Sequence, residues 1–301
     1  MSAAPPALDP PGLDFSGRTA IITGAGKGLG SAYARYLGAR GCAMVVGNRR
    51  AADGGSPAQA VVDAIVAAGG RAVAHDGPVE TAASAMEMVA LAERHFGPPD
   101  IFISNAGVQH WRDFATVTLE EMRSLLEINM WGVMLGLKAV WPAMLARGYG
   151  RIVLTGSSAG LWGQMQSADY GASKGAMVGL ARSLALDVPP GKDIRINVLC
   201  PAAYTPLSAG SFDPKWADYA SPDHVAPVVG WLCSPGCDTS GGIYHSGAGH
   251  IRRVQIVEGA VHHLSEGPVD AVMRGLEAQP EWNSSFASGA EILPEIAKAS
   301  S

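Results

Sequence analysis

The sequence predicts an α/β protein built on a doubly wound parallel sheet of seven strands. Two observations support this prediction: short apolar runs alternate with amphipathic stretches of helical length, and each run is apolar throughout rather than at every second residue. Strands of that kind are typical of a parallel sheet that helices cover on both faces. Right-handed crossovers between successive strands then give a Rossmann-type arrangement.

The elements alternate strictly, which fixes their order along the chain. The expected strands are Thr19–Thr23, Ala43–Gly47, Arg71–His75, Ile101–Ser104, Arg151–Thr155, Arg195–Leu199 and a short Ile243–His245. The expected helices are Ser31–Ala39, Pro57–Ala68, Thr81–His95, Leu119–Ala146, Ala168–Leu186 and Pro222–Cys233. No repeat or linker cuts this series, so we expect one domain at 15–260, a disordered lead at 1–14 and a C-terminal extension at 261–301.

Bulk composition narrows the function classes. The 301 residues suffice for one large domain, and 48% hydrophobic against 16% charged residues favours extra burial in an oligomer. A net charge of −5 offers no basic excess for a nucleic-acid partner. The lead lacks a signal or transit pattern, and Lys138 and Pro142 interrupt the most apolar long stretch, Ile128–Leu145. We therefore expect a cytoplasmic protein without a membrane partner.

Cysteines and histidines indicate no metal site. The four cysteines (Cys42, Cys200, Cys233, Cys237) are scattered, which favours buried thiols in a reducing compartment. His262-His263 resembles a pair of ligands, but the sequence supplies no further ligands at metal spacing. No metal is expected.

A glycine-rich turn follows the first strand directly and opens a helix. It reads Thr23-Gly24-Ala25-Gly26-Lys27-Gly28-Leu29-Gly30. Glycines at these places permit a tight turn and a close approach of the backbone to a pyrophosphate at the helix N-terminus. The turn therefore predicts dinucleotide binding, and a strand-to-helix turn without a ligand is the alternative.

The end of the second strand bears on the choice of cofactor. A carboxylate here would accept the 2′-hydroxyl of NAD and repel a 2′-phosphate, but Asn48 stands where that acid is expected. Arg49 and Arg50 follow, and arginine can clamp a phosphate bidentately, while Lys27 adds a positive charge beside the turn. We expect NADP(H), with NAD(H) as the alternative. The alternative interpretation is that these arginines lie in a solvated loop and bind no ligand.

Tyr170 and Lys174 stand four residues apart in an expected helix, and Ser157 lies thirteen residues upstream. Positions i and i+4 share a helix face, so a phenol and an ammonium would project into one site. An ammonium favours phenolate, which would lower the pKa of the tyrosine toward neutrality and make it a general acid/base. Together with a nucleotide-binding turn, this pair predicts hydride transfer to a carbonyl.

A competing motif overlaps the same region. Gly156-Ser157-Ser158-Ala159-Gly160 fits the nucleophile elbow of α/β hydrolases, with Ser158 as the nucleophile. That elbow needs a helix immediately after the turn, whereas the next helical pattern begins near Ser167. A Ser158 esterase is one alternative function, and a dinucleotide-binding sensor without turnover is another.

Taken in order, these motifs resemble the short-chain dehydrogenase/reductase family. The glycine turn, Ser104-Asn105-Ala106-Gly107, Asn129, Ser157, Tyr170 and Lys174 match the order of its motifs. Within about 15–260, the chain is similar to the hydroxyacyl-CoA dehydrogenase domain of multifunctional enzyme type 2 and its free-standing bacterial relatives. The segments that carry this narrower likeness are Gly17-Arg18, Tyr33-Ala34, Trp231-Leu232-Cys233 and Ser240–Gly249. Asn48 and Pro201-Ala202 depart from that domain, which has Asp and Pro-Gly there.

The resemblance implies a role for each matching residue. Tyr170 exchanges the hydroxyl proton, Lys174 holds the nicotinamide ribose, Ser157 hydrogen-bonds the substrate oxygen, and Asn129 carries a proton relay through a water. Cofactor contacts are implied for Asp76 at the adenine, Asn105, Ala106 and Gly107 at the switch point, and Pro201 and Thr205 in the loop over the nicotinamide. The implied activity is an NAD(P)-dependent interconversion of a secondary alcohol and a ketone (EC 1.1.1.-).

The types of side chain in two regions predict the substrate class and the oligomeric state. Bulky side chains fall in segments that border the family's pocket, which favours a bulky apolar substrate such as a 3-hydroxyacyl-CoA, a hydroxysteroid or an aryl or alkyl ketone; they are Trp111, Trp162, Met165, Tyr204, Trp216 and Tyr219. One side of Ala168–Leu186 carries only small residues, so two such helices can approach closely. We expect a homodimer or homotetramer.

Overall fold

The computed structural model describes residues 12–209, 213–259, 268–269, 273 and 282–284. The chain divides into two compact units, Met1–Arg253 and Val254–Ser301. Residues 1–11 of the expected disordered lead and most of the C-terminal extension, His262-His263 included, lie outside the described residues. Residues 12–14 of that lead are described, and Leu13 packs against the core. The first unit contains the predicted α/β domain. In the second, β9 (Glu258–Gly259) and β10 (Trp282–Ser284) pair antiparallel.

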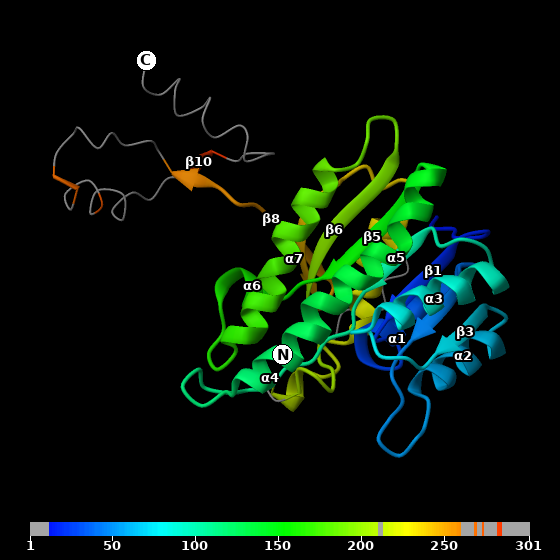
Figure 1. Cartoon of the computed structure of the whole chain (residues 1–301), viewed down its shortest axis with the longest axis horizontal. Helices are drawn as coiled ribbons and strands as arrows, with labels where there is room; N and C mark the ends of the chain where they lie inside the picture. Colours follow the sequence, from blue (N-terminus) through cyan, green and yellow to red (C-terminus); the bar gives the residue numbers. More distant parts are fainter. Residues whose placement is uncertain (1–11, 210–212, 260–267, 270–272, 274–281, 285–301) are drawn as a thin grey trace. The chain divides into compact units, whose positions relative to one another are not determined.

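An eight-stranded sheet in the order β3-β2-β1-β4-β5-β6-β7-β8 forms the centre of the fold (Figure 1). Neighbours from β3 to β7 pair parallel, as predicted. The strands are β1 (Thr19–Thr23), β2 (Ala43–Gly47), β3 (Arg71–His75), β4 (Ile101–Ser104), β5 (Tyr149–Thr155), β6 (Asp193–Ala202), β7 (Ile243–Gly247) and β8 (His250–Val254). The winding direction reverses between β1 and β4, and in sheets of this kind ligands bind at that switch point.

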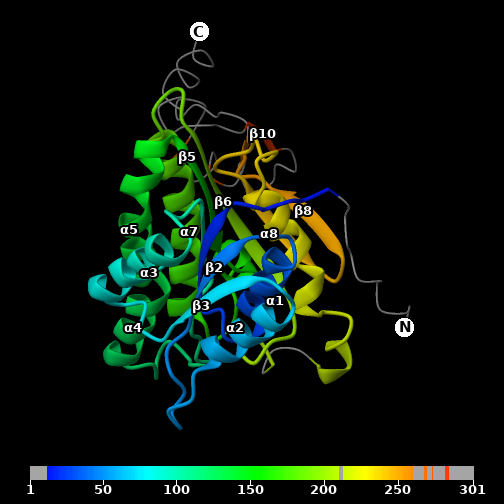
Figure 2. The ribbon, with the colours of Figure 1, turned by 90° about the vertical axis from the view of Figure 1, so that its right-hand side faces the viewer.

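Helices cover both faces of the sheet (Figure 2). One layer holds α1, α2 and α8, and the other holds α3, α5 and α7, with α4 beside them. The bounds are α1 (Gly28–Gly38), α2 (Pro57–Ala67), α3 (Ala82–His95), α4 (Leu119–Leu126), α5 (Gly132–Arg147), α6 (Ser158–Trp162), α7 (Ala168–Leu186) and α8 (Ala226–Cys233). Because both faces are covered, β1, β2 and β4 are buried along their whole length. This explains their continuous apolar sequences.

Local sequence sets several helix starts. Ser56 caps α2 through the Gln59 amide, with Pro57 at the first helical position. Thr118 and Glu121 form a capping box at the start of α4. The expected single helix Leu119–Ala146 is instead α4 and α5 joined by a π turn at Glu127–Trp131. Such a turn is frequent at functional sites.

The eighth strand was not predicted from the sequence. β8 follows β7 through a two-residue turn in which Ala248 and Gly249 both have positive φ, 50° and 76°. That turn type joins antiparallel neighbours. All but the last residue of β8 are exposed, so the strand lacks the apolar run by which the other seven were recognised. The seven-stranded expectation is therefore short by one edge strand.

The continuous helical run Leu119–Arg147 is long and apolar enough to cross a membrane by length and composition. Half of its most apolar window is buried inside the protein. The buried side chains include Val133, Leu137, Val140 and Met144. A helix that packs against a sheet needs this apolar surface for the core.

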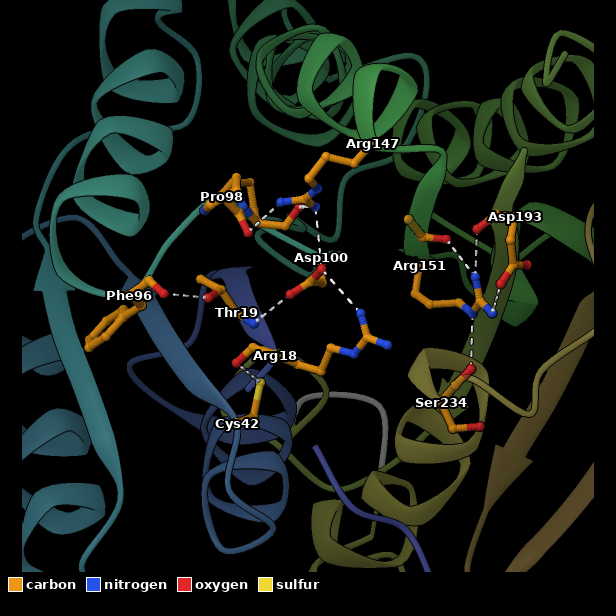
Figure 3. A network of polar contacts seen from close by, with 12 residues as sticks. Arg18, Thr19, Cys42, Phe96, Pro98, Asp100, Arg147, Arg151, Asp193 and Ser234 are labelled. Atoms are coloured by element: carbon orange, nitrogen blue, oxygen red, sulfur yellow. Dashed lines mark hydrogen bonds and ion pairs between the residues drawn. The ribbon is translucent and has the colours of Figure 1, made fainter. Parts of the chain in front are cut away.

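Polar side chains close the amino-terminal edge of the sheet (Figure 3). Asp100, immediately before β4, accepts a hydrogen bond from the Thr19 amide at 3.0 Å. The same carboxylate pairs with Arg18 at 3.4 Å and with Arg147 at 3.3 Å. These contacts tie β1, β4 and the end of α5 together.

Arg151, on β5, is completely buried at the same edge. Its guanidinium donates to the carbonyls of Gly150, Asp193, Ser234 and Pro235 at 2.8–3.2 Å. It also pairs with the Asp193 carboxylate at 2.8 Å. Because a buried charge is costly unless it is fully hydrogen-bonded, this complete set of partners explains how Arg151 is accommodated.

Candidate active site

A cleft lies at the carboxyl ends of the strands, where the winding of the sheet reverses. It consists of two adjoining cavities with volumes of about 550 and 220 Å³. Both are lined by Gly24, Lys27, Asn48, Ala106, Gly107, Gln109, Pro206 and Leu207. The larger cavity extends past Arg49 and Arg50, and the smaller one reaches Ser157, Tyr170 and Lys174. The shared walls make one continuous groove.

Most of the predicted site residues line this groove. They are Gly24, Lys27, Gly28, Leu29, Asn48, Arg49, Asn105, Ala106, Gly107, Ser157, Tyr170, Lys174, Pro201 and Thr205. Thr23, Gly26, Gly30, Asp76 and Asn129 do not line it. Thr23, Gly26, Gly30 and Asn129 contact residues that do line it.

The glycine turn passes so close to neighbouring backbone that side chains are excluded. Gly24 has a φ of +63°, and a Cβ there would lie 2.6 Å from the Cα of Ala106. A Cβ on Gly30 would lie 2.6 Å from Nδ2 of Asn105. α1 begins inside the turn at Gly28, so its free amide groups open into the cleft. This cradle has the shape and the donors that a pyrophosphate requires.

Asn105 joins the ends of β1 and β4 at the switch point. The Asn105 and Ala106 amides donate to Oγ1 of Thr23 at 3.0 and 3.1 Å. Nδ2 of Asn105 donates to the carbonyls of Thr23 and Gly24 at 3.2 and 3.0 Å. The side chain therefore holds the glycine turn in place.

Helix α7 brings Tyr170 and Lys174 together as the four-residue spacing predicts. Tyr170 is 6% exposed and Lys174 is 4% exposed. Nζ of Lys174 lies 5.8 Å from the centre of the Tyr170 ring and donates to the Thr155 carbonyl at 2.9 Å. A hydrogen bond joins the Ser157 hydroxyl to the Tyr170 phenol. Ser157, Tyr170 and Lys174 thus meet in the smaller cavity.

The predicted lowering of the Tyr170 pKa is wrong for this geometry. Burial raises the pKa of the phenol, and the hydrogen bond from Ser157 opposes that shift without reversing it. Burial lowers the pKa of Lys174 to about 8. Tyr170 is therefore protonated at neutral pH, the state in which it can donate a proton to a carbonyl oxygen.

Asn129 lies in the π turn and is completely buried. Its Oδ1 accepts from the Val108 amide at 2.8 Å, and its Nδ2 donates to the Val108 carbonyl at 2.9 Å and to Ser173 at 3.2 Å. A Cβ on Gly107 would lie 3.4 Å from both Oδ1 of Asn129 and Nζ of Lys174. Glycine thus keeps a gap open between these two polar atoms, and the water relay through that gap stays a prediction.

The two arginines at the end of β2 differ in their contacts. Arg50 pairs with Asp76 at 2.8 Å and donates to the Gly54 carbonyl. Asp76 also accepts from Ser56, so its carboxylate is already engaged. The Arg49 guanidinium is exposed in the larger cavity and has no polar partner among the residues that the structure describes. Oδ1 of Asn48 accepts from the Gly26 amide at 3.3 Å, which ties the strand end to the glycine turn.

The Ser158 alternative has a partial structural basis. A five-residue helix, α6, begins at Ser158, so the expectation that no helix follows the turn was wrong. Among the described residues, no histidine lines either cavity and no basic side chain contacts Ser158. A serine nucleophile needs an adjacent base.

The groove also contains polar residues that the sequence analysis did not single out. Gln109, two residues beyond Gly107, lines both cavities, and Gln164 lines the smaller one. Of the bulky side chains expected near the pocket, those of Trp111, Trp162, Met165, Tyr204 and Tyr219 line neither cavity, and that of Trp216 lies outside the described part of the chain. Trp162 is 64% exposed beside the ring of His245, and Met165 is 88% exposed. Only its position just past the switch-point motif could have indicated Gln109.

Among the described residues, no three side chains of His, Cys, Asp or Glu gather as metal ligands. All four cysteines are buried and unbridged, as the sequence indicated. Cys200 lies beneath Gly156, where burial raises the pKa of its thiol to about 11. The groove brings the glycine turn together with Ser157, Tyr170 and Lys174, the groups that a dinucleotide-dependent oxidoreductase uses.

Comparison with known proteins places that class in one family. The family model described as short chain dehydrogenase matches residues 18–214. A short-chain type dehydrogenase/reductase of Mycobacterium tuberculosis is 34% identical over 79% of this chain and 85% of its own length. The 3-oxoacyl-[acyl-carrier-protein] reductase of Escherichia coli is 34% identical over 63% of this chain and 74% of its own. The chain belongs to the short-chain dehydrogenase family.

A solved structure supports the same assignment. Full-length peroxisomal multifunctional enzyme type 2 of Drosophila melanogaster aligns with a TM-score of 0.78 and 27% identity, over 95% of this chain and 50% of that one. The chain spans 27–58% of the length of the curated multifunctional relatives that it matches. The likeness to multifunctional enzyme type 2 that the sequence indicated is confirmed. The protein is an oxidoreductase of a family that binds NAD(H) or NADP(H).

Proposed function

We propose that the protein is an NADP(H)-preferring enzyme that interconverts a ketone and a secondary alcohol. The observation that carries the cofactor preference is the unpaired guanidinium of Arg49 at the end of β2, beside Asn48 where an acid would disfavour a 2′-phosphate. Arg50 is already engaged by Asp76. Arg49 is thus the basic side chain at this strand end that is free to take a phosphate.

The protein's own groups support the reductive direction at neutral pH. When bound, the cofactor supplies the hydride. Tyr170 is a buried, protonated phenol that donates a proton to the carbonyl oxygen as charge develops there. Ser157, beside the phenol in the same cavity, would hydrogen-bond that oxygen as well. Lys174, fixed by the Thr155 carbonyl, presents its remaining N–H donors to the ribose side of the cleft.

The substrate we propose is an acyl or aryl ketone with a second polar group near the carbonyl. Ser158, Gln164 and Gln109 line the same cavity as Tyr170. Polar side chains at such positions select a ligand oxygen, since their own hydrogen bonds would otherwise be lost on binding. A 3-oxoacyl thioester has a second carbonyl, and one relative is by name a 3-oxoacyl reductase.

The test is a reductase assay on the purified full chain. NADPH and NADH would be compared at one salt concentration with a 3-oxoacyl thioester, an aryl ketone and a 3-oxosteroid. We expect the thioester to be the best substrate and NADPH to give the higher kcat/KM. A preference for NADH would contradict the cofactor proposal. Ester cleavage without cofactor would point to Ser158, and cofactor binding without consumption would point to a sensor.

A further inference from the structure

The turn that precedes Tyr170 is held from outside its own helix. Ser167, at the N-cap of α7, is 1% exposed and makes no side-chain cap to the helix. Its hydroxyl instead accepts a hydrogen bond from Nε2 of Gln109 at 3.1 Å. The preceding residue, Gln166, has a φ of 54°, a conformation that side-chain-bearing residues rarely adopt. The start of α7 therefore depends on the loop after β4.

A second contact joins the same two segments closer to the reacting group. Oδ1 of Asp169 accepts from the Tyr170 amide at 2.8 Å, and its Oδ2 lies 3.3 Å from Nε2 of His110. The Asp169 side chain is 6% exposed. Oδ2 of Asp169 and Nε2 of His110 are both buried, and neither makes a hydrogen bond among the described residues, so the 3.3 Å approach is their closest polar contact. The carboxylate thus bridges the backbone of Tyr170 and the loop.

A third contact joins the same two segments. The Arg112 amide donates to the Gln166 carbonyl at 3.0 Å. The loop therefore contacts the turn that leads into Tyr170 through three of its residues, which are Gln109, His110 and Arg112.

Stability alone is a weak explanation for the pair of His110 and Asp169. A buried polar pair recovers little more than the desolvation of its two groups, and apolar replacements are often as stable. Glu121, the other acid near His110, is engaged by Thr118 and Arg112. The pair instead fixes the position of the proton donor. This matters because a catalytic proton donor displaced by about 1 Å can lose on the order of 10²-fold in rate.

We propose that His110 and Asp169 are positioning residues that hold the first turn of α7, and with it the Tyr170 hydroxyl, against Ser157. This rests on the proposed function of Tyr170 as the proton donor. Gln109, beside His110, lines the groove, so the loop that contacts the substrate is the same loop that fixes the tyrosine.

The experiment uses the full chain and measures kcat, the KM for the ketone, the Kd for NADPH and the Tm. His110→Ala and Asp169→Ala should lower kcat roughly ten- to a hundred-fold while the Kd for NADPH changes by less than about twofold. His110→Gln should restore most of kcat, because its amide nitrogen can donate from the position of Nε2. A loop with a merely structural role would lower the Tm and would show no such rescue.

A matched control breaks a similar pair elsewhere. His75 and Glu87 also lie 3.3 Å apart, on β3 and α3. Glu87→Gln should leave kcat unchanged. If Asp169→Ala does not fold, His110→Ala, on a partly exposed loop residue, still decides the question.

Two outcomes would overturn the positioning role. One is a wild-type kcat in His110→Ala, and the other is an equal loss in His110→Ala and His110→Gln. Tyr170→Phe separates this proposal from the one on which it rests. If Tyr170→Phe is inactive while His110→Ala turns over normally, only the positioning role fails. If Tyr170→Phe retains activity, the proposed function itself fails.

Discussion

The two ends of the strands in this sheet each hold a buried cation, and the two cations differ in how completely they are hydrogen-bonded. At the amino-terminal edge, Arg151 is fully buried and bonded to four carbonyls and a carboxylate. At the carboxyl-terminal edge, Lys174 is nearly as buried, yet among the described residues its ammonium donates to one carbonyl, that of Thr155. Burial is common to both edges. What distinguishes the functional edge is incomplete hydrogen bonding beside a cavity, which leaves donors for a ligand.

The largest effect at the carboxyl-terminal edge is expected for a substitution of Tyr170. Tyr170→Phe should lower kcat by about 10²–10⁴-fold, because only the proton-transferring oxygen is removed. The Kd for NADPH, measured by fluorescence titration, should stay nearly unchanged. Tyr149→Phe is the matched control at the other edge, since the Tyr149 hydroxyl is buried and makes no hydrogen bond within the described part of the chain. It should retain full activity, and a Tyr170→Phe enzyme with most of the wild-type kcat would remove Tyr170 from the mechanism.

The amino-terminal edge should respond in stability rather than in rate. Arg151→Met leaves several buried carbonyls without a donor, so we expect a loss of about 3 kcal/mol in the free energy of unfolding. Urea titration measures this loss, and kcat per folded molecule should remain that of the wild type. Arg147→Met, which removes a partly exposed side chain, should cost less. A fall in kcat at full stability would show that the two edges are not separable.

At the cofactor end of the groove, the paired Arg50 can be compared with Arg49, which has no polar partner among the described residues. Asn48→Asp combined with Arg49→Leu should reverse the preference for NADPH over NADH, since it adds a ribose acceptor and removes a phosphate donor. A hydrogen bond to a charged group contributes about 1.5–3 kcal/mol, which corresponds to roughly ten- to a hundred-fold in affinity. The measurement is kcat/KM with each cofactor at one salt concentration.

Arg50→Leu serves as the control because Asp76 already engages that guanidinium. It should preserve most of the preference. If the wild-type enzyme favours NADH, or if Arg50→Leu alone abolishes the preference, the assignment of Arg49 is wrong.

Periodicity and local spacing were enough to predict the sheet and the placing of the main site residues. β1, β2 and β4 could be recognised because burial on both faces makes their sequences almost continuously apolar. Tyr170 and Lys174 converge because four residues make about one helical turn. β8 was missed because it is an exposed edge strand whose only signal is its two-residue turn.

The pKa values and polar partners of the site residues could not be predicted in the same way, because they depend on residues distant in the sequence. The pKa of Tyr170 was expected to fall beside Lys174, but burial raises it. The ammonium is drawn to the Thr155 carbonyl, nineteen positions away in the chain. Likewise, Asp76 meets Arg50 and Ser56 only after β2 and β3 have paired. Such contacts belong to the tertiary structure and leave no local pattern.

The smallest expected effect concerns the pH dependence of stability at Lys174. Burial lowers its pKa to about 8, below the ordinary value near 10.4. Below pH 8 the ammonium is charged in both the folded and the unfolded chain, so its desolvation cost is present in full. As the pH rises above 8, the folded chain releases this proton first and the unfolded chain holds more protons, so stability increases with pH.

Lys174→Met removes this titration. The wild type should gain on the order of 1 kcal/mol relative to Lys174→Met between pH 7 and pH 9, measured by urea unfolding at each pH. Lys138→Met, at an exposed position on α5, is the control and should follow the wild-type curve. Parallel curves for the wild type and Lys174→Met would mean that Lys174 keeps its charge through this range. The carboxyl-terminal edge would then tolerate a buried cation as completely as the amino-terminal edge tolerates Arg151.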